Sequence, residues 1–68
     1  MEFLPPVSSF EIRFHKSDGS VSLIMTISAF GPEEVMLRAF KMLNADLAYA
    51  IIWLGMAEVA TVHRDKPN

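Results

Sequence analysis

The spacing of apolar residues changes at Gly31-Pro32, and this change constrains the fold more than any other feature of the chain. From Val21 to Ala29 apolar residues recur at every second position, as in a half-buried strand. After Pro32 they recur at every third or fourth position, as on one face of a helix. Gly31 suits the N-cap, and Pro32 suits the first helical position, where its missing N–H would have no partner. We therefore expect a strand before Gly31 and a helix after it.

The predicted helix is amphipathic. Its apolar face is wide enough to cover a sheet and comprises Val35, Met36, Ala39, Phe40, Met42 and Leu43. Glu34 and Arg38 have the spacing of an exposed ion pair, whereas Leu37 interrupts the polar face. The pattern ends near Asn44, which we expect to close the helix in the left-handed conformation.

A β-hairpin is predicted before the helix. Between Phe10 and His15 apolar and polar residues alternate, which is typical of a strand with one buried and one solvated face. Asp18-Gly19 follows, and this dipeptide supplies the positive φ angles that a tight turn requires. Val21 to Ala29 then forms the second strand.

The segment after the helix allows two interpretations. Residues 48–54 carry bulky side chains on both sides, and Gly55 follows them. One interpretation is a second hairpin that turns around residues 55–57, with a first strand covered on both faces. The other is a single buried helix over residues 45–60. The β-branched residues Val59, Thr61 and Val62 favour the hairpin.

These elements predict an α+β fold of the order ββαββ, a four-stranded antiparallel sheet with one helix packed on one face. Strand order 2-1-3-4 avoids parallel neighbours and places the apolar third strand in the middle of the sheet. Strands 2 and 4 become edges with which another copy could pair. Residues 1–9 are predicted to be an extended leader containing Pro5-Pro6, residues 10–64 a single domain and residues 65–68 a polar tail.

Composition narrows the possible functions. A 68-residue chain has room for one domain and buries only about 60% of the surface that its unfolded chain exposes, whereas 51% of its residues are hydrophobic. Self-association would provide a further source of buried area, so we expect a homodimer. The longest nearly apolar stretch, residues 47–57, is too short to span a membrane. Residues 1–7 lack the features of a signal peptide and cysteine is absent, so we expect a cytoplasmic protein.

No motif for catalysis, cofactor binding or metal binding is present. His15 and His63 are far apart in the sequence and have no acidic or cysteine companions at ligand spacing. Gly19, Gly31 and Gly55 are too scattered to form a phosphate-binding loop. We therefore expect a protein that is not an enzyme, with no cofactor.

Two surfaces are candidates for binding. The first is a protein-binding surface, for which the candidate residues are Leu37, Tyr49 and Trp53. The second is an anion-binding or nucleic-acid-binding patch at one edge of the predicted sheet, made of Arg13, His15, Lys16, His63 and Arg64. The net charge of −2 disfavours nucleic acid, so we expect a protein-interaction or accessory module and keep single-stranded nucleic-acid binding as the alternative.

Overall fold

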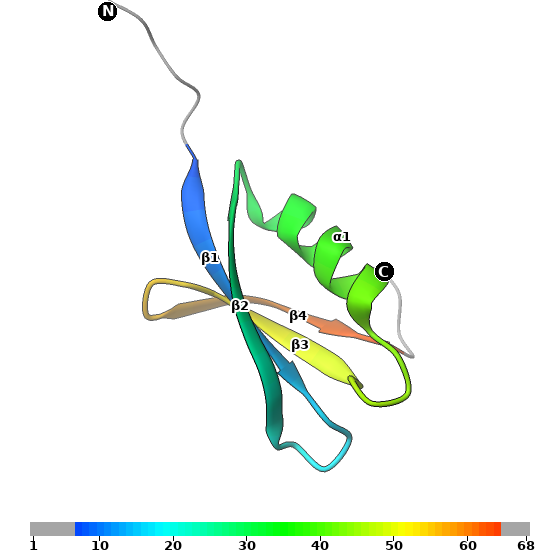
Figure 1. Ribbon diagram of the computed structural model, residues 1–68. Helices are drawn as coiled ribbons and strands as arrows, with labels where there is room; N and C mark the ends of the chain where they lie inside the picture. Colours follow the sequence, from blue (N-terminus) through cyan, green and yellow to red (C-terminus); the bar gives the residue numbers. More distant parts are fainter. Residues whose placement is uncertain (1–6, 65–68) are drawn as a thin grey trace, which may run out of the picture.

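The structure, a computed structural model, describes residues 7–64 and contains one sheet and one helix (Figure 1). The elements are β1 (Ser8–His15), β2 (Val21–Ala29), α1 (Pro32–Met42), β3 (Tyr49–Leu54) and β4 (Ala57–His63). All neighbouring strands are antiparallel, and their order is β2-β1-β3-β4. The predicted α+β fold and strand order are therefore confirmed, and residues 45–60 contain a hairpin rather than a long helix.

The first strand extends into the predicted leader, residues 1–9. β1 begins at Ser8, two residues before the predicted Phe10, and pairs there with Ala29. Most of the predicted leader, residues 1–6, and the predicted tail, residues 65–68, lie outside the described residues. No helix within residues 7–64 is long and apolar enough to cross a membrane.

Both hairpins turn at a glycine in a backbone conformation that other residues rarely adopt. Gly19 has φ +93° between β1 and β2, and Gly55 has φ +63° between β3 and β4. In the first turn, one carboxylate oxygen of Asp18 accepts hydrogen bonds from the backbone N–H of Ser20 at 2.9 Å and from its hydroxyl at 2.7 Å. These bonds favour the ionised carboxylate and lower the pKa of Asp18 below 3.8.

The start of α1 is as predicted, but its end is not. Gly31 has an extended backbone and Pro32 begins the helix. At the other end Leu43 leaves the helix in an extended conformation, and Asn44 does not adopt positive φ, so the predicted left-handed cap is wrong. The Asn44 side chain instead accepts hydrogen bonds from the backbone N–H groups of Asp46 at 2.8 Å and Leu47 at 3.0 Å. A side-chain turn thus replaces the expected cap.

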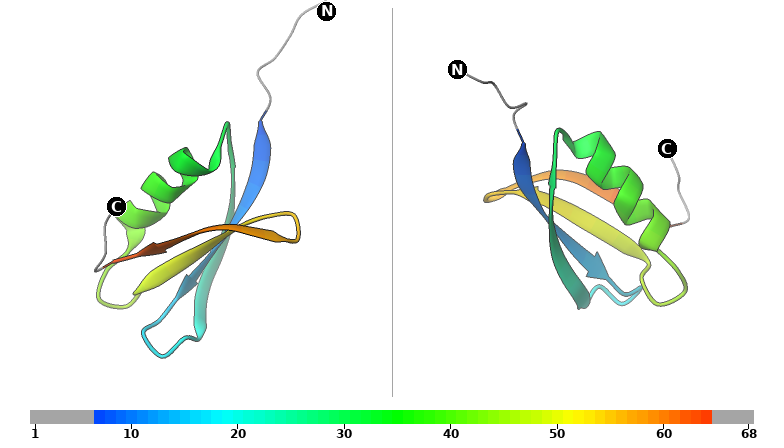
Figure 2. Two further views of the ribbon diagram at one scale, coloured as in Figure 1. Left: turned by 180° about the vertical axis from the view of Figure 1, so that it is seen from behind. Right: turned by 45° about the horizontal axis from the view of Figure 1, so that its top comes forward.

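The core lies between α1 and the middle of the sheet. Its fully buried members include Phe10, Ile12 and Phe14 of β1 and Ile52 of β3, and Val35 of α1 packs onto them. Figures 1 and 2 show α1 lying closer to β3 and β4 than to β2. The helix therefore leaves part of the β2 side of this face uncovered, and no other element formed by residues 7–64 covers the opposite face of the sheet.

Candidate interaction surfaces

The face of the sheet opposite α1, called the open face below, brings together three aromatic rings from three different strands. Backbone register places Tyr49 between His15 and His63. The His15 and Tyr49 ring centroids are 4.8 Å apart with planes 5° from parallel, and Tyr49 and His63 are 5.5 Å apart at 28°. The sheet thus assembles three of the candidate residues into one stacked row.

The geometry of this row determines what it can bind. Neighbouring strands lie about 4.8 Å apart, so rings stacked at this spacing stand side by side on the sheet rather than lying flat on it. Both faces of Tyr49 are consequently covered by imidazole rings. A nucleic-acid base stacks on an exposed aromatic face, and Tyr49 does not offer one.

Trp53 lies on the same face and is also partly covered. The Arg13 guanidinium carbon is 4.7 Å from the centroid of the Trp53 ring, a cation–π contact. The Arg13 guanidinium also forms an ion pair with Glu11, directly opposite Trp53 in the register. Glu58 on β4 flanks Trp53 on its other side. Charges of both signs therefore surround Trp53.

The remaining predicted cations do not join this arrangement. Lys16 lies in the exposed turn that follows β1. An Nη1 group of Arg64 donates a 2.7 Å hydrogen bond to the backbone oxygen of Asn44, which ties the end of β4 to the loop after α1. Of the five predicted members of the patch, the open face gathers Arg13, His15 and His63.

Two polar atoms on the open face are shielded from solvent and lack hydrogen-bond partners within residues 7–64. They are Nε2 of His15 and Nε1 of Trp53. His15 Nδ1 is 2.9 Å from the carbonyl oxygen of Gly19, which assigns the donor role to Nδ1–H. An unsatisfied buried polar atom costs on the order of 1–3 kcal/mol of folding free energy, so a hydrogen-bond partner for either atom would stabilise the folded protein.

The candidate protein-binding residues do not form one surface. Leu37 is 57% exposed on the outer side of α1, whereas Tyr49 and Trp53 are half-buried on the opposite side of the molecule. Within residues 7–64, no three His, Cys, Asp or Glu side chains are placed to hold a metal ion together. Within the described part of the chain, the open face provides aromatic and polar side chains for packing and hydrogen bonding.

The two edge strands differ in charge and in regularity. β2 has no charged residue, and Val21, Leu23 and Ile24 are 50%, 42% and 55% exposed, on both faces of the sheet. Its register shifts once near its start and is unbroken from Leu23 to Ala29. In β4, by contrast, Ile52 pairs with Ala60 and Trp53 pairs with Glu58, so Val59 forms a bulge.

The sequence pattern predicted both edge strands but did not predict this difference between them. The absence of charge from residues 21–29 was a usable signal, because natural edge strands are normally protected by charge, proline or a bulge. The bulge at Val59 had no such signal, since no glycine or proline marks it.

We found no significant match to this chain among protein-family models, curated proteins or solved structures.

Proposed function

We propose that this protein is a small non-enzymatic interaction module that forms a homodimer by pairing β2 of one copy with β2 of a second. The observation that carries the proposal is the β2 edge, where the stretch from Leu23 to Ala29 is regular and uncharged. The free N–H and C=O groups of such an edge are a template for another strand. A twofold axis near Thr26 would join the two sheets into one of eight antiparallel strands.

Side chains beside the edge support the same arrangement. Leu23 and Ile24 project on opposite faces of β2 and are both more than 40% exposed. Pairing of two β2 strands would bury part of these side chains on each face, in addition to satisfying backbone groups. No charge on either strand would oppose the approach of the second copy. The absence of cysteine is compatible with a reducing compartment, and we propose a cytoplasmic location.

The alternative, single-stranded nucleic-acid binding on the open face, has weaker support. The Tyr49 ring is enclosed between two imidazoles, and one face of Trp53 is covered by Arg13. Glu11 and Glu58 also lie beside Trp53, where they would repel phosphate groups. Base stacking would require rearrangement of these side chains.

The test compares the same substitution at the two edges. Ile24→Lys places a charge on β2, and Val59→Lys places one on β4, where the native side chain is 40% exposed. Sedimentation velocity over a micromolar concentration series should show a dimer for the wild type and for Val59→Lys. Ile24→Lys should weaken association at least about tenfold, because a lysine on an edge strand disfavours pairing with a second strand.

Other outcomes would reject this proposal in different ways. Circular dichroism first establishes that each variant retains the fold. A wild type that stays monomeric throughout the series would contradict the homodimer. Disruption by Val59→Lys alone would assign the interface to β4, and disruption by a folded Trp53→Ala variant alone would assign it to the open face. Retention of a short single-stranded oligonucleotide at physiological salt would favour the alternative function.

A further inference from the structure

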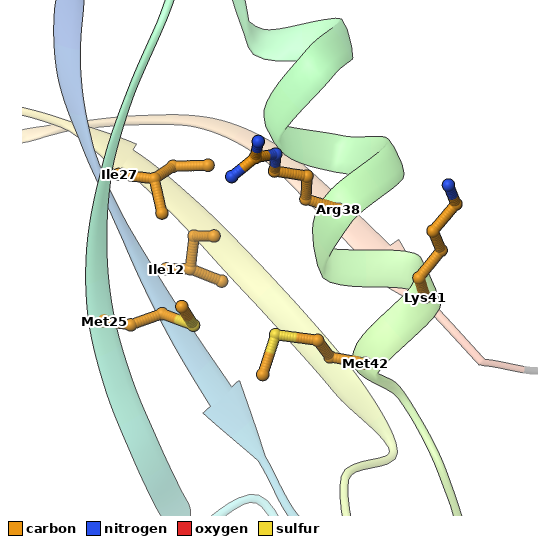
Figure 3. A pocket seen from close by; sticks show the side chains of 6 residues that line it. All are labelled: Ile12, Met25, Ile27, Arg38, Lys41 and Met42. Atoms are coloured by element: carbon orange, nitrogen blue, oxygen red, sulfur yellow. The ribbon is translucent and has the colours of Figure 1, made fainter.

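A groove lies between β2 and α1, on the same face of the sheet as the helix, where the helix leaves the β2 side uncovered (Figure 3). Its volume is about 360 Å³, within the range of small-molecule pockets. Six side chains from three elements line it, namely Ile12, Met25, Ile27, Arg38, Lys41 and Met42. This site is on the opposite face of the sheet from the row of stacked rings, and the inference does not depend on the proposed function.

The floor of the groove is apolar and adaptable. Ile12 from β1 and Ile27 from β2 form its rigid part, and Met25 and Met42 face each other from β2 and the end of α1 (Figure 3). Methionine is unbranched and polarizable, so it adjusts to the shape of an apolar ligand. Met42 is 37% exposed although it belongs to the apolar face of the helix. An apolar ligand in the groove would remove this surface from water.

The rim of the groove is cationic. The Arg38 side chain extends from α1 toward β2, and Lys41 extends from the last turn away from β2 (Figure 3). The predicted pair between Glu34 and Arg38 does not form, and neither cation has an acidic partner among residues 7–64. A guanidinium without a partner beside an apolar floor is suited to a carboxylate, which it can bind through two hydrogen bonds.

We propose that this groove binds a single-chain carboxylate amphiphile, with its alkyl chain along the methionine and isoleucine side chains and its carboxylate on Arg38. A peptide fits less well. Its backbone N–H groups would require hydrogen-bond acceptors, whereas the lining side chains are aliphatic, thioether or cationic groups that provide no strong acceptor. An alkyl chain has no such requirement, and the Arg38 guanidinium, which extends toward β2, complements a single anionic head group.

The methionine methyl groups allow a direct test in the wild-type protein. Decanoate, kept below its micelle-forming concentration, is titrated into protein whose methionine methyl groups are labelled for NMR. Resonances of Met25 and Met42 should shift and saturate, and that of Met56, which is 97% exposed at the far hairpin, should not. Acetate has the same head group without the chain, and decyltrimethylammonium has the same chain with a cationic head. Both should bind at least about tenfold more weakly.

Variants then test the role of Arg38. Arg38→Gln should weaken decanoate binding about tenfold, and Arg38→Lys should restore part of the affinity because it restores the charge. Lys16→Gln removes the same charge from the exposed first hairpin and should leave binding unchanged. Equal binding of decanoate and the ammonium amphiphile, or no effect of Arg38→Gln, would overturn the proposal. Shifts of Met25 and Met42 that follow protein concentration but not decanoate would show instead that a second copy covers the groove.

Discussion

The two edges of the sheet are built differently, although both belong to one small domain. β2 is nine residues long and uncharged, whereas β4 is seven residues long and carries both Glu58 and a bulge at Val59. A bulge interrupts the regular row of backbone groups that a new strand would need, and a charge opposes its approach. One edge of the sheet is therefore suited to pairing and the other is protected against it.

This asymmetry sets the size of the proposed assembly. A domain with two open edges can add a copy at each side and extend without limit. A domain with one open edge stops at two copies, because pairing of β2 with β2 uses that edge in both. The protection of β4 is consequently as important for a closed dimer as the regularity of β2.

Removal of the protection from β4 should produce the largest effect. Deletion of Val59 together with Glu58→Thr would preserve the pairing of Trp53 with residue 58 and of Ile52 with Ala60, but without the bulge or the charge. We expect assemblies larger than a dimer, growing with protein concentration, since both edges would then accept a strand. Light scattering and sedimentation velocity would measure this growth.

Glu58→Thr alone is the matched control, because it removes the charge and keeps the bulge. It should remain dimeric, with at most a slight tendency to associate further. If the doubly altered protein also stays a dimer with the native circular dichroism spectrum, Glu58 and the bulge at Val59 do not prevent β4 from pairing. The proposed difference between the two edges would then be rejected.

The sequence predicted the elements better than it predicted the surfaces. The strands, the start of α1 and the strand order followed from periodicity, from Gly31-Pro32 and from the antiparallel return of the chain. Local hydrogen bonds were less predictable: Asn44 uses its side chain to form a turn, although the same residue type can also take a left-handed cap. The bulge at Val59 and the turning of Arg38 toward β2 depend on tertiary packing, so residue type alone did not reveal them.

A smaller effect is expected on the open face, and it distinguishes that face from the β2 edge. Arg13→Met retains an aliphatic side chain beside Trp53 but removes the cation–π contact and the ion pair with Glu11. We expect the free energy of unfolding to fall by roughly 0.5–1 kcal/mol. Urea denaturation would measure this loss, and the sedimentation of the folded variant should be unchanged. A monomeric Arg13→Met variant would move the interface from β2 to the open face.

The smallest effect is expected at the turn that joins β1 to β2 and so positions the β2 edge. Asp18 is fully exposed, and its hydrogen bonds to Ser20 lower its pKa from 3.8. A carboxyl group whose pKa is lower in the folded than in the unfolded protein stabilises the fold above its unfolded pKa, and this stabilisation is lost as the pH falls through the folded value. Asp18→Asn keeps a side-chain oxygen for the turn but has no charge to titrate. The wild type should therefore lose slightly more stability than Asp18→Asn between neutral pH and about pH 2, as measured by urea denaturation. The opposite order would mean that the ionised carboxylate does not stabilise the turn, and that Gly19 with its positive φ is sufficient to position β2.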